Sequence, residues 1–203
     1  MLGRAAVAMW WDIAPPVKAE FEDWHSHEHM PERLAIPGFL RGTRWIALSG
    51  KPSYFVLYEA AKLATITRGA YLKRLNNPTP WSRKMMPHHR NMVRSLCLVR
   101  ASFGAYVGHA LATIRLPSSK KPSSGLRALA QRKGLSGAHL LESQPMTGIP
   151  RTTEQKIRGG DATADWVLLV CGYDVEALKA AVANEPAAAF YRLSYTLSAK
   201  EIT

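Results

Sequence analysis

The sequence predicts an α+β chain in which two consecutive βαββαβ units pack sheet to sheet as one barrel-like body. Two observations support this fold class. The chain has 203 residues, which is enough for two units of about 100 residues each. Strand-like and helix-like hydrophobic patterns also follow one another in the same order twice. Each unit carries both helices on one face of its sheet, so two units can cover each other's bare faces and enclose a cavity.

The first predicted unit spans residues 1–104. Hydrophobic alternation predicts four strands, at residues 5–13, 39–48, 54–59 and 93–103. Helical spacing of apolar residues predicts two helices, at residues 17–35 and 64–75. Proline has no N–H and clashes with the preceding turn, so Pro31 must interrupt or kink the first helix after Met30.

The second predicted unit spans residues 105–203 and repeats the same order. Its strands are predicted at residues 106–116, 135–144, 165–173 and 189–199, and its helices at residues 125–133 and 175–184. Its first helix lacks the acidic and aromatic residues of the helix at 17–35, so we expect one elaborated site in the first unit and a degenerate second unit. The polar stretch at 145–164 is long for a connection and is expected to be mobile or to act as a flap over a site.

The composition is that of an ordinary globular protein, with 47% hydrophobic and 21% charged residues. No apolar run approaches the roughly 20 residues that cross a bilayer, and the first residues lack the pattern of a leader. Cys97 and Cys171 lie in apolar strand-like runs and indicate no disulfide framework. We therefore expect a cytoplasmic protein with no membrane partner.

Positive charge is unevenly distributed along the chain. The net charge is +12, and residues 60–141 contain no Asp or Glu. One interpretation is a basic surface for anions such as nucleic acid, and the other is an ordinary solvated surface. No helix-turn-helix, zinc-finger or RNA-binding motif accompanies the charge. We therefore favour the solvated surface and expect no specific nucleic-acid binding.

The most distinctive segment is FEDWHSHEHMPERLAIPGF, residues 21–39. It contains the pattern W-H-x-x-E-H-x-P-x-R, formed by Trp24, His25, Glu28, His29, Pro31 and Arg33. This pattern, followed by Pro37, Gly38 and Phe39, resembles the EthD-like group of the dimeric α/β-barrel (ferredoxin-like) superfamily, although His25 stands where tyrosine is usual. The resemblance implies an internally duplicated chain of two ferredoxin-like units, which can itself form a homodimer. It also implies small-molecule chemistry, which in this superfamily ranges from polyketide cyclases to cofactor-independent monooxygenases.

The residues of this segment suggest proton transfer. His29 lies next to the helix break, where the helix dipole favours its cationic form, and is the predicted acid–base residue. Glu28 lies near Trp24, so its carboxylate is an orienting group or an alternative base with a raised pKa. Arg33 is the predicted contact for an anionic group, and Trp24 a wall of the site. The alternative is a structural brace, in which Arg33 pairs with Glu28 while His29 caps backbone carbonyls.

Further substrate-binding candidates are His25, Trp10, Asp12 and Arg44. Asp12 shares a strand face with Trp10, so it is either a second base in an apolar pocket or a solvated residue at the strand end. Arg44 and Trp45 point to opposite faces of their strand, so one of them enters the cavity.

Two histidines on one face of a helix are also a pattern found in metal sites. His25 and His29 are one helical turn apart, but no third ligand stands at a defined position, and we expect no metal. His88 and His89 are expected to lie exposed on a loop.

These observations predict a binding protein for a small aromatic or polyketide-like molecule, or a cofactor-independent enzyme that transfers protons in a barrel cleft. No cofactor is expected, because the sequence contains no phosphate-binding glycine loop and no Rossmann fingerprint. The alternative is a non-catalytic structural or stress-associated barrel.

Overall fold

The structure is a computed structural model that describes residues 1–120, 125–145, 148 and 150–202. Eight antiparallel strands form a closed barrel in the order β1-β3-β2-β8-β5-β7-β6-β4. The strands are β1 (Ala5–Asp12), β2 (Phe39–Ala47), β3 (Tyr54–Ala60), β4 (Arg90–Gly104), β5 (Ala110–Leu116), β6 (Leu135–Ser143), β7 (Trp166–Gly172) and β8 (Ala188–Ser198). The predicted α+β class is confirmed, and each predicted strand is present within a few residues.

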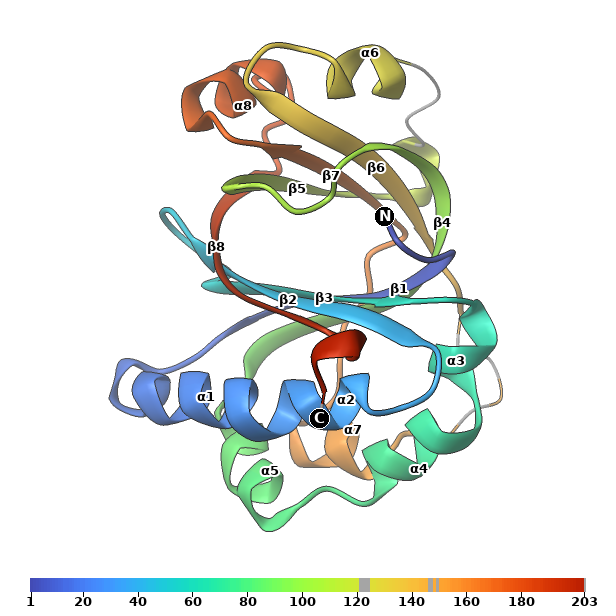
Figure 1. Ribbon diagram of the computed structural model, residues 1–203. Coiled ribbons are helices and arrows are strands. Elements are labelled where there is room, and N and C mark those ends of the chain that lie inside the picture. The colour runs from blue at the N-terminus through green and yellow to red at the C-terminus, as the bar shows by residue number, and fades with distance from the viewer. Residues whose placement is uncertain (121–124, 146–147, 149, 203) are drawn as a thin grey trace.

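Two layers of helices cover the outside of the barrel (Figure 1). The helices are α1 (Lys18–Trp24), α2 (Met30–Leu34), α3 (Leu63–Thr67), α4 (Gly69–Asn76), α5 (Pro80–Met85), α6 (Leu126–Ala130), α7 (Thr153–Ile157) and α8 (Val175–Ala181). Helices α6 and α8 form one layer, and the others lie on the opposite side of the barrel. The sequence analysis missed α5 and α7 because helices this short show no hydrophobic period. No helix among the described residues is long and apolar enough to span a membrane.

The barrel joins two groups of four strands at both edges. The first group has the order β4-β1-β3-β2, and the second has the order β8-β5-β7-β6, which is the same order shifted by four strands. Strand β2 pairs with β8, and β4 pairs with β6. The two sheets were predicted to face each other, but they are also hydrogen-bonded to each other at both edges. Pairing at both joints satisfies backbone groups that two separate sheets would leave open at their edges.

The inside of the barrel is a packed core. Inward-facing residues of the strands form one hydrophobic cluster whose largest members are Trp10, Trp45, Phe55, Tyr106 and Tyr191. These side chains are at most 2% exposed. An eight-stranded barrel is just wide enough for its own side chains to fill it. The space that the sequence analysis assigned to a ligand inside the barrel is thus occupied by this aromatic core.

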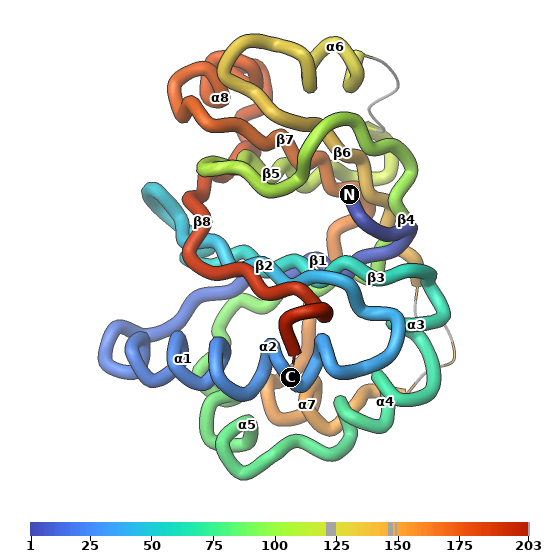
Figure 2. Tube along the Cα trace, in the orientation of Figure 1, coloured from blue at the N-terminus to red at the C-terminus, as the bar shows by residue number. Residues whose placement is uncertain are grey.

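The outer faces of the barrel carry two further clusters. The cluster under α1, α2, α4 and α5 combines aromatic, methionine and aliphatic side chains. The cluster under α6 and α8 is dominated by alanine, leucine, isoleucine and valine. Figure 2 shows that the chain passes from one layer to the other and back, because α7 follows β6 yet lies with the first-half helices.

The helix of the histidine motif contains an irregular turn. A π-helical turn, His25–His29, separates α1 from α2, and Pro31 lies in the first turn of α2. The predicted interruption after Met30 is therefore misplaced by one turn. Proline has no N–H to donate to the carbonyl oxygen four residues earlier, so the hydrogen-bond register changes ahead of it. In this turn, His25 and His29 are buried, whereas His27 is exposed.

Candidate functional site

The motif histidines line a small cavity between the first-half helices and the outer face of the barrel. The cavity measures about 30 Å³, which is room for one or two water molecules. We call it the histidine cavity. Its polar lining comes from His25, His29, His89, Tyr58, Tyr71, Arg33, Arg94, Arg158 and Glu154. Its apolar lining comes from Met9, Trp11, Leu75, Met86 and Met92. The predicted cleft therefore has a counterpart outside the barrel rather than inside it.

His25 and His29 are held side by side by the π-helical turn. Their ring centroids are 5.6 Å apart, and the His29 ring packs on Trp24 at 4.4 Å. The Nε2 atom of His25 lies 3.3 Å from the hydroxyl of Tyr58. The Nδ1 atoms of both histidines are buried and have no hydrogen-bond partner among the described residues. These nitrogens are consequently available to a ligand or a water molecule.

His89 enters the cavity from the segment that precedes β4. Its Nδ1 lies 3.2 Å from the carbonyl oxygen of Met85 and 3.3 Å from that of Met86. Carbonyl oxygens only accept hydrogen bonds, so Nδ1 must carry the proton and Nε2 the lone pair. The expectation that His89 is exposed is wrong, because the ring packs between Trp11 and Phe21.

All three histidines are neutral near pH 7. Burial lowers the pKa of His25 and of His29 well below the usual value, and the charge of Arg33 lowers both further. Burial and the charge of Arg158 lower the pKa of His89 to about 3. The expectation that His29 is cationic is therefore wrong. His29 lies inside a continuous helical segment rather than at a helix end, and its ring is buried away from solvent. The cavity offers neutral imidazoles in a positively charged environment, which favours an anionic ligand.

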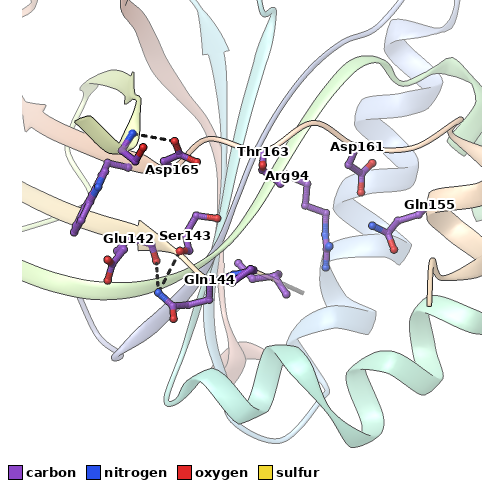
Figure 3. A pocket seen from close by; sticks show the side chains of 12 residues that line it. Arg94, Glu142, Ser143, Gln144, Gln155, Asp161, Thr163 and Asp165 are labelled. Carbon is purple, nitrogen blue, oxygen red and sulfur yellow. Dashed lines mark hydrogen bonds between the residues drawn. The ribbon is translucent and has the colours of Figure 1, made fainter. Parts of the chain in front are cut away.

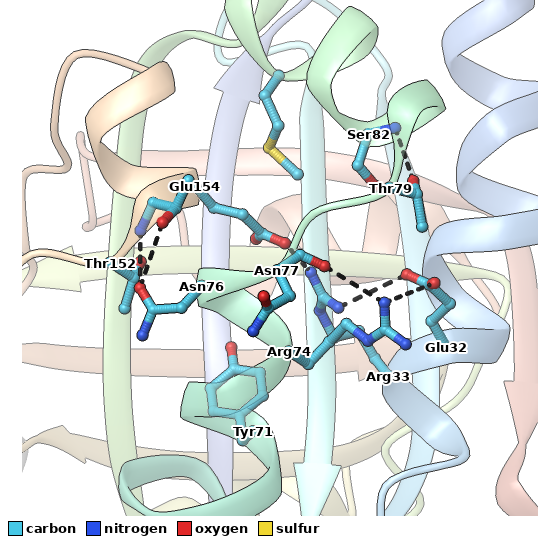
Figure 4. Close-up of polar contacts among 12 residues, drawn as sticks. Glu32, Arg33, Tyr71, Arg74, Asn76, Asn77, Thr79, Ser82, Thr152 and Glu154 are labelled. Atoms are coloured by element: carbon cyan, nitrogen blue, oxygen red, sulfur yellow. Dashed lines mark hydrogen bonds and ion pairs between the residues drawn. The ribbon is translucent and has the colours of Figure 1, made fainter.

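Helix α7 closes one side of the cavity through a buried ion pair. Arg33 donates to the carboxylate of Glu154, and each side chain is 2% exposed (Figure 4). Arg158, one turn later, lies 3.7 Å from Glu154 and bonds Asp161 at 2.9 Å. The predicted flap at 145–164 thus contains a helix that covers the site. Its motion stays a prediction.

Arg33 has a different partner from the one expected. The brace hypothesis paired Arg33 with Glu28, but the buried partner is Glu154, and Glu32 lies 3.9 Å away. Glu28 turns toward α5 instead, where its Oε1 accepts hydrogen bonds from Trp24, Thr79 and Ser82. The structure therefore places Glu28 as a link between two helices, outside the lining of the cavity.

The three remaining candidates lie elsewhere. Trp10 points into the barrel and donates from Nε1 to Thr113 at 3.1 Å. Asp12 is the last residue of β1. Burial raises its pKa, but hydrogen bonds from Ser53 and Asn91 outweigh this effect, so the pKa is lowered. The expectation of a second base in an apolar pocket is therefore not met.

Arg44 is on the helix side of β2 and donates to the carbonyl oxygen of Glu22 at 2.9 Å. It acts on the cavity only through its charge, which contributes to the lowered pKa of His25.

Sequence reasoning missed six polar residues of the cavity: Tyr58, Tyr71, His89, Arg94, Glu154 and Arg158. Tyr58 and Arg94 lie on the helix-facing sides of β3 and β4, a fact that strand alternation could have signalled. Glu154 and Arg158 carried no local signal, because α7 comes from the second half of the chain. A metal site is not assembled: among the residues described, no three His, Cys, Asp or Glu side chains are placed to hold an ion.

The fold, but not the sequence, is similar to that of known proteins. No protein-family model and no curated protein matches the sequence. A crystal structure described as an anthrone oxidase-like protein has a TM-score of 0.59 and 11% identity, over 98% of this chain and 94% of that chain. Two structures named "putative monooxygenase" cover at least 97% of this chain and 96% of their own. The one from Fusobacterium nucleatum subsp. nucleatum has a TM-score of 0.51 and 10% identity, and the one from Lactobacillus acidophilus NCFM has 0.53 and 8%. The chain is thus similar in fold to monooxygenase-like α/β-barrel proteins.

Proposed function

We propose that the protein binds a small aromatic molecule with an acidic C–H or O–H group in the histidine cavity, and that His29 accepts its proton. The observation that carries this proposal is a set of three buried, neutral histidines around one enclosed space, of which His25 and His29 each have an Nδ1 without a hydrogen-bond partner among the described residues. Buried polar atoms without a hydrogen-bond partner destabilise the folded state, so the two unpartnered Nδ1 atoms support a site in which a ligand satisfies them.

The charges around the cavity support an acid that becomes an anion. The charges of Arg33 and Arg158 lower the pKa of His29 and so disfavour an imidazolium, and together with Arg94 they favour an enolate or phenolate in the cavity. Once the ligand anion forms, its negative charge offsets the charges of the arginines and raises the pKa of the His29 ring. The proton can then remain on His29 while the negative charge remains on the ligand. Trp24 supports the His29 ring from behind.

The size of the cavity restricts how such a molecule enters. About 30 Å³ holds water but not an aromatic ring, so α7 or its neighbours must move when the ligand binds. The contacts that hold α7 include the Arg33–Glu154 pair and a hydrogen bond of 2.9 Å from the Thr153 amide to Asn76. We therefore include a movement of α7 in the proposal.

Hydrogen–deuterium exchange into anthrone tests proton transfer without any redox step. Anthrone is chosen because it is a C–H acid and because one structural neighbour is described as anthrone oxidase-like. In D₂O under nitrogen, the wild type should speed exchange of the methylene protons. His29→Ala should remove most of this effect, on the order of 100-fold. His27→Ala is the matched control, since this exposed histidine lies in the same turn. No acceleration by the wild type, or an equal loss in both variants, would contradict the proposal.

A second candidate is the non-catalytic barrel. It is favoured by one observation: Glu28 and Arg33 make contacts that join helices α1, α2, α5 and α7. This reading predicts that the wild type neither accelerates exchange nor is stabilised by aromatic ligands in a thermal-shift screen.

The proposal also covers ancestry and assembly. The shifted strand order supports a duplicated ferredoxin-like unit with bounds 1–104 and 105–203, and residues 21–39 support the EthD-like group. We keep the cytoplasmic location and a homodimer of the duplicated chain as parts of the proposal. Sedimentation equilibrium of the purified chain tests the homodimer directly.

A further inference from the structure

A second cavity lies where the two strand groups join, on the outside of the barrel. It measures about 420 Å³, within the usual range for small-molecule sites. We call it the seam cavity. Its walls come from β4, α7 and the facing ends of β6 and β7, and Figure 3 shows polar side chains around it. Arg94 lines both this cavity and the histidine cavity, so it forms part of the wall between them.

Arg94 is a buried charge without an acidic partner. It is 6% exposed, and its Nη2 donates to the hydroxyl of Tyr71 at 3.1 Å. Among the described residues, no carboxylate lies within ion-pair distance of its guanidinium. The nearby acids Glu154 and Asp161 already pair with Arg33 and Arg158. A buried guanidinium is costly unless an anion balances it. The charges of Asp161 and Glu154 act on Arg94 from a distance and help to raise its pKa, but neither forms an ion pair with it.

The other side of the cavity is acidic. Figure 3 shows Glu142 and Asp165 there, and Arg94, Gln155 and Asp161 opposite them, where Asp161 is paired with Arg158. Asp165 is exposed and accepts a hydrogen bond of 2.9 Å from the Ser118 amide. Glu142 is engaged with Arg100. The cavity therefore has the guanidinium of Arg94, which has no ion-pair partner among the described residues, on one side and the carboxylates of Glu142 and Asp165 on the other, a distribution that matches a molecule charged at both ends.

We propose that the seam cavity binds a small zwitterion, with its carboxylate on the guanidinium of Arg94 and its ammonium group toward Asp165. Guanidinium groups bind carboxylates through two parallel hydrogen bonds, which fixes the orientation of the ligand as well as its charge. The opposite wall then discriminates against dicarboxylates, which would meet like charge at Asp165. This site needs neither the histidines nor the proposed proton transfer.

A series of amino acids of increasing chain length measures the distance between the two walls. The probes are glycine, β-alanine, γ-aminobutyrate and ε-aminocaproate, titrated by calorimetry against the full chain. One length should bind at least about tenfold more tightly than the shortest member and than the simple carboxylate of its own length. The absence of binding by every member, or equal binding of the zwitterion and its matched carboxylate, would overturn the proposal.

Two variants assign the ends of the ligand. Arg94→Gln should weaken the best probe by about 100-fold, whereas Arg90→Gln, an exposed site on the same strand, should not. Asp165→Asn keeps the acceptor for Ser118 and should abolish the preference for the zwitterion over its matched carboxylate. If Arg94→Gln fails to fold, Asp165→Asn decides alone: a lost preference supports the proposal, and an unchanged preference overturns it.

Discussion

The two outer faces of the barrel solve the same packing problem in different ways. Under α6 and α8, the second half buries an almost purely apolar cluster on β5, β6 and β7. Under α1, α2 and α5, the first-half face buries histidines and arginines around a cavity, and the α7 segment adds Glu154 and Arg158. The strand order is the same in both groups, so the difference arises in the helices. The barrel supports both faces, and the first-half helices with α7 supply the polar side chains of the histidine cavity.

The largest expected effect concerns the buried Arg33–Glu154 pair. Glu154→Gln should lower the free energy of unfolding by about 3–5 kcal/mol, because it leaves the charge of Arg33 buried without its partner. The matched control is the second-half pair Lys179–Glu176, which is exposed. Glu176→Gln should cost at most about 1 kcal/mol. Urea unfolding monitored by tryptophan fluorescence measures both values.

The double variant Arg33→Met with Glu154→Met tests the explanation of that loss. If the cost of Glu154→Gln comes from an unpaired buried charge, then removal of both charges should restore most of the stability. A double variant that is no more stable than Glu154→Gln would show that the pair fixes α7 by its geometry rather than by charge balance.

The sequence predicted the fold far better than the site. Alternation located all eight strands, because burial on a sheet repeats every two residues. The motif also located His25, His29 and Arg33, since a helical turn brings such residues to one face. The motif gave no sign of Glu154 and Arg158, because both reach the cavity from a distant part of the chain. Glu154 lies 121 residues beyond its partner Arg33.

The error on Glu28 has a different origin. Glu28 and His29 are neighbours in the sequence, but consecutive helical residues point about 100° apart, so they could not share one cavity wall. Glu28 accordingly faces Thr79 and Ser82 on α5. The expected cavity inside the barrel is filled because inward side chains are large, such as those of Trp45 and Tyr191. An eight-stranded barrel has little space left beside side chains of this size.

The second prediction is that the first half makes the protein sensitive to acid. The pKa of His89 is lowered to about 3, and those of His25 and His29 are lowered as well, so the unfolded chain binds protons that the native chain does not. Stability is then fully present above pH 6.5 and falls as the pH decreases from 6.5 toward 3. Each such group contributes up to about 1.4 kcal/mol per pH unit.

Denaturant titrations at pH 7, 6 and 5 measure this slope. In His89→Gln, the slope should decrease by about one proton, because one of the groups that titrate only on unfolding is gone. His27→Gln is the control for the substitution of histidine by glutamine at an exposed position. Equal slopes in all three proteins would mean that the buried histidines do not create the acid sensitivity.

A smaller effect is expected at His29 itself. Because its Nδ1 has no hydrogen-bond partner among the described residues, His29→Gln breaks no hydrogen bond from that atom and keeps most of the buried volume, so it should change stability by less than about 1 kcal/mol at pH 7. A structural histidine that satisfied buried carbonyls would instead cost about 1–3 kcal/mol when removed. A loss in the larger range, together with unchanged exchange activity, would favour the non-catalytic barrel.

The smallest expected effect is that of a chelator on the first half. Three histidines near one cavity resemble a zinc site, but the rings of His25 and His29 are 5.6 Å apart, and Arg33, Arg94 and Arg158 make the surroundings unfavourable for a cation. Dialysis against EDTA should therefore leave the melting temperature unchanged within about 1 °C, and added zinc should not raise it. A fall of several degrees that zinc reverses would show that the histidines rearrange around a metal, and the first half would then differ from the second by an ion as well as by its helices.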